Sequence, residues 1–345
     1  MLDRLGSHWL HPDRDLHGCK SLSVELLYAR DATPGFDWDA VGGRIAMCRL
    51  KRVPVALRVD WKPRQVLPPM NDEEGVFDYV QAIQQAVADY NPAWIICGNE
   101  TNLHAETGDE EIQPWWVARV VYGHQQPADR TDNCFQFAKT IDPHVQVLAP
   151  AVGPYSPDSA GDATGLRIPD GREMLAPWES YMYDLARGCY DNGWHVPEIG
   201  DVKFAMHTYG RTGADGQDNG GAAEPFNDVR EGTYGAQFGS RWLQDALWYC
   251  RQGLLNSPYG VDYYPGGILI SEANTLTDAM PCDSYPNGWW QNLIGYVNQF
   301  PNVMGLAAFV DQDLGGMWSD TAMSIPKDQL RQWDNDHNQC LRQGW

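Results

Sequence analysis

Short apolar runs alternate with longer amphipathic segments along the chain. This alternation is typical of βα units that build a parallel sheet. The apolar runs predict eight strands, the number that closes a barrel. They lie near residues 5–10, 22–28, 53–59, 93–98, 145–150, 202–207, 267–271 and 303–310. We therefore expect an α/β fold, a single-domain (β/α)8 TIM barrel over residues 1–345, with long loops on the C-terminal face of the sheet.

The amphipathic segments predict helices between these strands, near residues 37–51, 75–90, 129–141, 174–190, 236–254, 286–299 and 326–342. The connections after strands four, five and six are long, roughly 101–128, 151–173 and 208–235. Because a barrel builds its site from the loops at the C-terminal strand ends, we expect a site on that face. Five aromatic residues in or beside these loops either line a groove or pack under the loops: Trp115, Trp116, Tyr122, Tyr155 and Trp178.

A buried strand ends at a carboxylate in the segment Pro92–Asn102. Its five apolar residues are bounded by Pro92 and Gly98 and are followed by Asn99 and Glu100. A continuous apolar run of this length fits a parallel strand covered on both faces. Taken alone, Glu100 also fits a solvated loop carboxylate. A second stretch of the same kind changes that interpretation.

The second stretch, Gly266–Asn274, is again a short aliphatic strand that ends in a carboxylate, Glu272. In the predicted barrel it is strand seven, and strands four and seven lie across the bowl from each other. Glu100 and Glu272 are therefore expected to face each other. Two carboxylates ~5 Å apart perform retaining glycoside hydrolysis, one as proton donor and the other as nucleophile.

These residues resemble the signature of the clan A glycoside hydrolases, retaining (β/α)8 enzymes that act mostly on β-linked sugars. The matching motifs are Asn99–Glu100 at the end of strand four and Glu272 at the end of strand seven. The resemblance implies that Glu100 is the acid/base and Glu272 the nucleophile. It also implies that Asn99 binds the 2-hydroxyl of the sugar being cleaved. Such hydrogen bonds strengthen as the transition state develops.

Strand six carries a His-x-Tyr pattern that is also similar to this clan, with His207 and Tyr209. The resemblance implies that the Tyr209 hydroxyl binds the nucleophile and keeps it ionised. For His207 three roles stay open: binding the acid/base, binding the substrate, or packing at the barrel rim.

Strand three ends Arg58–Val59–Asp60–Trp61. A buried arginine requires carboxylate partners, so Arg58 is expected to restrain Glu272 and lower its pKa. Asp60 and Trp61 are candidate sugar contacts.

Two further candidates for substrate binding lie near the ends of strands one and eight. His8 is close to the end of strand one. Clan members place a tryptophan near the end of strand eight, under the reactive sugar. Trp318 is the nearest candidate here, but it lies several residues beyond the expected strand end, so the identity of the sugar platform stays open.

Charge and composition narrow the class of partner. The chain has 25 basic and 46 acidic residues and a net charge of −21. Phosphate binding depends on clustered Lys and Arg, so we expect no nucleic-acid and no anionic-membrane partner. No apolar run approaches the ~20 residues that span a bilayer. The 15 Trp and 16 Tyr residues suit stacking on sugar rings, although a large barrel core also uses bulky aromatics. A neutral carbohydrate is the expected substrate.

The eight cysteines are scattered without metal-ligand spacing, so we expect no zinc site. The expected retaining mechanism needs no metal and no cofactor. No basic segment followed by an apolar one is visible at the N-terminus, so location is open between the cytoplasm and, if a signal was removed, secretion. Oligomeric state, sugar identity and disulfide pairing are also open. Long loops favour a cleft and hence endo-action.

Two rival interpretations remain. A metal-dependent amidohydrolase barrel would use His8, His11, His207 and Asp311. Strand one, however, offers His-x-x-His rather than His-x-His, strand four lacks a bridging lysine, and strand five ends without a ligand. A barrel that binds carbohydrate without catalysis is the second rival, and the presence of both glutamates counts against it.

Overall fold

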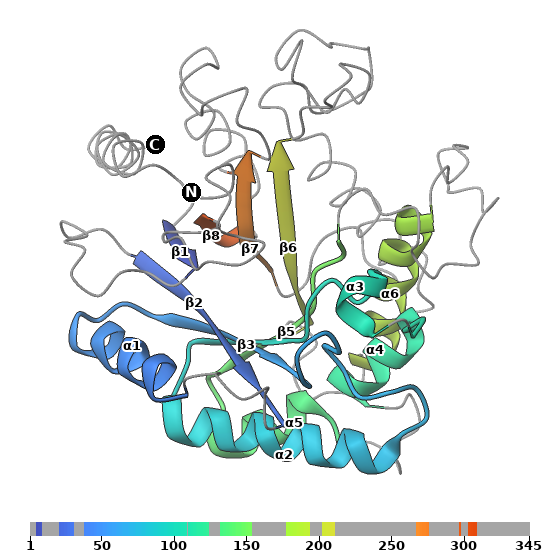
Figure 1. Cartoon of the computed structure of the whole chain (residues 1–345), viewed down its shortest axis with the longest axis horizontal. Coiled ribbons are helices and arrows are strands. Elements are labelled where there is room, and N and C mark those ends of the chain that lie inside the picture. Colours follow the sequence, from blue (N-terminus) through green and yellow to red (C-terminus); the bar gives the residue numbers. More distant parts are fainter. Residues whose placement is uncertain are drawn as a thin grey trace, which may run out of the picture. The chain divides into compact units, whose positions relative to one another are not determined.

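The computed structural model describes residues 5–8, 21–30, 38–108, 110–123, 132–153, 177–193, 202–210, 267–275, 297 and 303–308. The strands are β1 (Leu5–His8), β2 (Ser21–Tyr28), β3 (Val55–Asp60), β4 (Trp94–Cys97), β5 (Gln146–Ala149), β6 (Lys203–Gly210), β7 (Ile268–Thr275) and β8 (Val303–Ala308). The helices are α1 (Trp38–Leu50), α2 (Glu73–Tyr90), α3 (His104–Thr107), α4 (Pro114–Tyr122), α5 (Cys134–Ile141) and α6 (Pro177–Gly193). Figure 1 labels them.

The chain divides into two compact units, which are described separately. Unit 1 takes residues 1–24, 207–245 and 269–345, and unit 2 takes residues 25–206 and 246–268. Three of the four boundaries fall inside strands β2, β6 and β7.

The sheet of unit 2 is parallel and runs in sequence order. Strand β3 pairs with β4, β4 with β5, and β5 with β6. The backbone N–H of Phe204 donates to the carbonyl of Gly267, just before β7. Side chains such as Leu57, Ile95 and Leu148 are fully buried. Strands covered on both faces explain the continuous apolar runs in the sequence.

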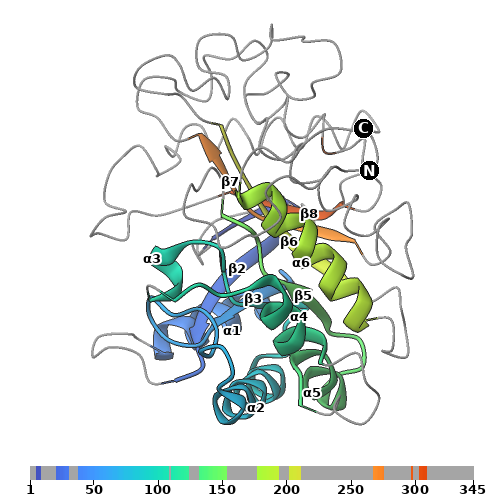
Figure 2. The ribbon, with the colours of Figure 1, turned by 90° about the vertical axis from the view of Figure 1, so that its right-hand side faces the viewer.

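Helix α2 shows how the helices of unit 2 are built. Asp72 caps its N-terminus by accepting a hydrogen bond from the Gly75 N–H at 2.9 Å, and Asn91 ends it in the left-handed conformation. Its buried face repeats at helical spacing and includes Val76, Tyr79, Val80, Ile83 and Val87. Helix α2 packs beside α5, and α4 beside α6 (Figure 2).

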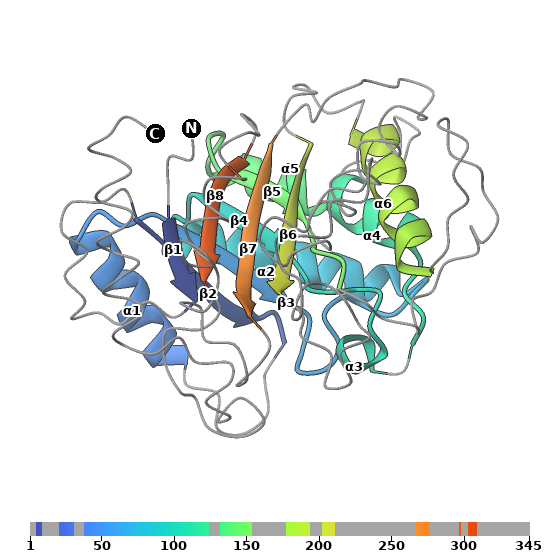
Figure 3. The ribbon, with the colours of Figure 1, turned by 90° about the horizontal axis from the view of Figure 1, so that it is seen from above.

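Unit 1 contains a parallel pairing of β8 with β1 and of β1 with the first half of β2 (Figure 3). Gly6 of β1 lies opposite Leu22 of β2. A Cβ atom at Gly6 would come within 1.9 Å of the Leu22 carbonyl oxygen, so only glycine fits this close approach.

The eight predicted strands and the helices predicted near 37–51, 75–90, 129–141 and 174–190 are confirmed within a few residues. The prediction of one irregular connection over 101–128 is wrong, because α3 and α4 form there. The three helices predicted after residue 235 lie outside the described residues, apart from Val297. None of the described helices has the length and apolar character needed to cross a bilayer.

Candidate active site

Glu100 lies on a tight turn directly after strand β4. The Gly98 N–H continues the sheet by donating to the Val59 carbonyl at 2.8 Å, and Gly98 then adopts a φ of 85°. Glu100 itself has a φ of 25°, which is rare for a residue with a side chain. Such conformations cost about 1–3 kcal/mol and persist where the surroundings impose them, often at functional sites. Asn99, next to it, is buried with 4% of its surface exposed.

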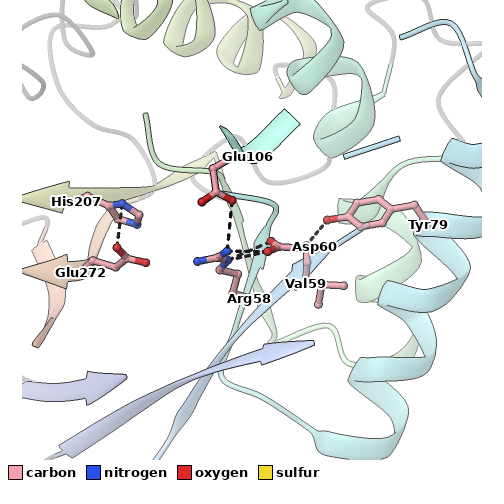
Figure 4. Close-up of polar contacts among 7 residues, drawn as sticks. All are labelled: Arg58, Val59, Asp60, Tyr79, Glu106, His207 and Glu272. Atoms are coloured by element: carbon pink, nitrogen blue, oxygen red, sulfur yellow. Dashed lines mark hydrogen bonds and ion pairs between the residues drawn. The ribbon is translucent and has the colours of Figure 1, made fainter. Parts of the chain in front are cut away.

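Glu272 and His207 form a buried pair in unit 1. The Nδ1 atom of His207 on β6 lies 3.4 Å from Oε2 of Glu272 on β7 (Figure 4). The two residues are 2% and 5% exposed. A buried carboxylate is costly unless it is paired and hydrogen-bonded, and the imidazole supplies that partner. Both residues lie inside their strands rather than at the strand ends, because β6 and β7 continue to Gly210 and Thr275.

Arg58 lies at the end of β3 in unit 2, where it is paired with carboxylates. Its Nε and NH2 atoms bond the Asp60 carboxylate, with the shortest contact 2.6 Å, and Glu106 of α3 lies 3.9 Å away (Figure 4). Arg58 and Asp60 are two residues apart on one strand, so they share a face of the sheet. The pKa of Tyr28 is raised, first by burial and then by the negative charge of Asp60. Arg58 therefore pairs with Asp60 and Glu106. Its expected restraint of Glu272 stays a prediction.

Trp61 follows this strand but has little open surface. It is 3% exposed, the Arg30 guanidinium lies 4.4 Å from its ring centroid, and Tyr79 meets it edge-on at 6.1 Å. The Tyr79 hydroxyl donates to the Val59 carbonyl at 2.6 Å, which attaches α2 to the end of β3 (Figure 4). A sugar that stacks on Trp61 would have to displace Arg30 or reach a narrow edge of the indole.

The remaining candidate residues are described only in part or not at all. His8 and Tyr209 belong to β1 and β6, but their side chains lie outside the described residues. Trp318 lies outside them entirely, as do Tyr155, His11 and Asp311.

Two of the loop aromatics are buried packing residues. Trp116 is 1% exposed and donates its indole N–H to the Pro68 carbonyl at 3.0 Å. The Tyr122 hydroxyl bonds the carbonyls of Val147 and Lys203. Trp115 is 52% exposed. Packing therefore accounts for Trp116 and Tyr122, and only Trp115 of these three is open for stacking.

Sequence reasoning missed Asn102 and Tyr181, which hold the turn that carries Glu100. Asn102 is 2% exposed and bonds the backbone of Gly153, and Tyr181 is fully buried against Thr101. The signal available in the sequence was a second amide closely following Asn99. Nothing in the sequence indicated that the backbone of Gly153, 51 residues away, would be the partner of Asn102.

Comparisons by sequence find no relative: no family model matches the chain, and no curated protein does.

Comparison with solved structures does find matches. A family 39 glycoside hydrolase from the gut symbiont Bacteroides cellulosilyticus WH2 has a TM-score of 0.53 and 12% identity, over 93% of this chain and 59% of that one. A glucosidase from Croceicoccus marinus has a TM-score of 0.49 and 11% identity, over 89% and 57%. A hyperthermophilic endocellulase from the archaeon Pyrococcus horikoshii has a TM-score of 0.48 and 14% identity, over 92% of this chain and 83% of that one.

The chain thus spans less than two thirds of the length of the first two structures. At 12% identity, the similarity to the family 39 glycoside hydrolase concerns the fold alone.

Proposed function

We propose that this chain is a retaining glycoside hydrolase that cleaves β-glycosidic bonds of a neutral oligo- or polysaccharide. In this proposal the eight strands close one (β/α)8 domain, with Glu100 and Glu272 facing each other across the bowl. The observation that carries the proposal is the buried Glu272 held by His207 at 3.4 Å. A carboxylate kept at 5% exposure on an inner strand, with an imidazole to orient it, suits a nucleophile.

The reaction follows a double displacement. A Glu272 oxygen attacks the anomeric carbon while the bond from that carbon to the leaving oxygen breaks. Glu100 gives its proton to the leaving oxygen, and a glycosyl-enzyme ester forms. Glu100 then takes a proton from water, the water oxygen attacks the anomeric carbon, and the Glu272 carboxylate is released. Asn99 binds the 2-hydroxyl in both steps.

The charges of the chain suit an uncharged sugar. The Arg58 guanidinium is engaged by Asp60 and approached by Glu106, so its charge is compensated within unit 2. With a net charge of −21, the chain as a whole also repels anionic polymers. Endo-action and the roles of His8, Tyr209, Asp60, Trp61 and Trp318 in binding are part of the same proposal. No cofactor is required by this chemistry.

The test replaces each glutamate and adds azide, with a panel of activated aryl β-glycosides as substrates. We expect Glu272→Gly to lose turnover and to regain it with azide, giving an α-glycosyl azide. We expect Glu100→Ala to give a β-glycosyl azide, because azide then attacks the glycosyl-enzyme. Retention of wild-type turnover in both variants would contradict the mechanism.

The same assay separates the two rivals. A binding protein raises its melting temperature with sugar but releases no product. A metal-dependent hydrolase loses activity after dialysis against EDTA and regains it with zinc. The proposed enzyme keeps its activity in EDTA.

A further inference from the structure

The turn that carries Glu100 is buried and tightly bonded, although it is a loop. We call residues 98–103 the Glu100 turn. Asn99, Thr101 and Asn102 are 4%, 1% and 2% exposed. The Leu103 N–H closes the turn by donating to the Glu100 carbonyl at 2.8 Å. Glu100 stays at a φ of 25° inside this turn, so its surroundings must hold it there.

Asn102 ties the Glu100 turn to the segment that follows strand β5. Its Nδ2 donates to the Gly153 carbonyl at 3.0 Å, and its Oδ1 accepts from the Gly153 N–H at 2.5 Å. One amide thus engages both backbone groups of a single residue, which fixes orientation as well as distance. Leu103 fills the adjoining space, because a Cβ atom at Gly153 would lie 2.5 Å from Leu103 Cγ.

Tyr181 of helix α6 provides a second attachment. Its hydroxyl lies 2.9 Å from Thr101 Oγ1 and 2.8 Å from the Ile112 carbonyl oxygen. Tyr181 is fully buried, so loss of either bond would leave a polar atom in an apolar interior. The bond to Tyr181 therefore restrains Thr101, and through the backbone it also restrains Glu100 before it and Asn102 after it.

We propose that Asn102, Thr101 and Tyr181 are positioning residues that aim the Glu100 carboxyl at the leaving oxygen. This inference rests on the proposed function, in which Glu100 is the proton donor. None of the three touches the substrate. They act through the backbone of the Glu100 turn, where a displacement of about 1 Å is enough to reduce proton transfer by up to 10²-fold.

Leaving-group dependence is the readout that separates positioning from a merely structural role. A dinitrophenolate leaves without protonation, whereas an unsubstituted phenolate needs the proton from Glu100. A variant that misplaces Glu100 loses kcat/KM for the phenyl glycoside and retains it for the dinitrophenyl glycoside. A variant that only weakens folding reduces both equally, through the fraction of folded enzyme.

The experiment measures kcat/KM on phenyl and 2,4-dinitrophenyl β-glycosides of the sugar identified by the aryl glycoside panel. We expect Asn102→Ala and Tyr181→Phe to lose about tenfold on the phenyl substrate and less than about twofold on the dinitrophenyl one. Thr101→Val should behave like Tyr181→Phe, and Thr101→Ser should restore the wild-type ratio because it keeps the hydroxyl.

Tyr122→Phe is the matched control. Tyr122 is also a buried helix tyrosine bonded to backbone carbonyls, but its partners Val147 and Lys203 do not belong to the Glu100 turn. We expect its ratio of phenyl to dinitrophenyl activity to equal that of the wild type. Equal ratios in Asn102→Ala, Tyr181→Phe and Tyr122→Phe, with Glu100→Gln still selective for the good leaving group, overturn the positioning roles alone. A Glu100→Gln variant without such selectivity overturns the proposed function, and the positioning roles with it.

Discussion

Glu100 and Glu272 are held by different means. Glu100 lies on a turn with an uncommon backbone conformation, and its neighbours in the chain are bonded to Gly153 and Tyr181. Glu272 lies inside a regular strand, and a side chain, His207, holds it. The difference shows that a carboxylate can be positioned through its backbone or through its own oxygen atoms. The two modes predict different responses to mutation.

The largest loss of activity is expected at Glu272, because a side chain, His207, holds its carboxylate. His207→Asn removes the imidazole from Glu272, and we expect kcat/KM to fall about 10²-fold for both phenyl and dinitrophenyl glycosides. Both substrates are affected because nucleophilic attack is needed whatever the leaving group. Steady-state kinetics on the two substrates measure this.

His144→Asn is the control for the preceding change, because His144 is exposed on the connection before β5. It should leave kinetics unchanged. Selective loss with the phenyl substrate in His207→Asn would instead connect His207 with the acid/base.

The second prediction compares the free energies of unfolding of the glycine and alanine variants at each glutamate. The difference between the two variants should have opposite signs at positions 100 and 272. Glycine reaches positive φ without strain, so Glu100→Gly should be about 1 kcal/mol more stable than Glu100→Ala. Inside strand β7 glycine costs backbone entropy, so Glu272→Gly should be about 1 kcal/mol less stable than Glu272→Ala. Urea unfolding of the four variants gives both differences, and the alanine variants cancel the loss of the side chain. If glycine were the more stable variant at both positions, or alanine at both, the backbone conformations of Glu100 and Glu272 would not differ in the way described.

The smallest effect is a change in thiol labelling. Cys97 lies just before the Glu100 turn, is fully buried, and has a pKa raised well above its usual value, mainly by burial. A protonated buried thiol reacts slowly, so native Cys97 should resist DTNB and react in urea. Asn102→Ala should increase its labelling rate about threefold by letting the turn open, and His207→Asn should not. Mass spectrometry of the labelled peptides resolves Cys97 from the other cysteines. Equal rates in both variants would show that the turn does not depend on Asn102.

Much of the fold was predictable because local patterns carry it. The run ending at Gly98 was identified as a buried strand from its shortness and from the proline and glycine that limit it. Helix α4 was missed, although Pro114 at its first turn and the apolar run after it are helix signals. For the aromatic residues of that segment the sequence left open whether they line a groove or pack, and Trp116 and Tyr122 pack inside unit 2.

The pairing of His207 with Glu272 was not predictable in the same way. Each residue was identified separately as a candidate on its strand. Which atoms meet depends on how β6 and β7 are aligned, and that alignment depends on which faces become buried once the strands come together. For Arg58, the need for carboxylate partners followed from its burial. The sequence did not show which carboxylates would come close enough, and in the structure they are Asp60 and Glu106 of unit 2.

Local patterns in the chain were enough to predict the alternation of strands and helices and to identify Glu100 and Glu272, because apolar periodicity and its interruption by a charge are local properties. The left-handed backbone of Glu100, the bonds from Asn102 to Gly153, and the contact of His207 with Glu272 arise only in the folded chain. These features join residues far apart in the chain. Their free energy comes from burial and from polar partners that exist only once the sheet has formed.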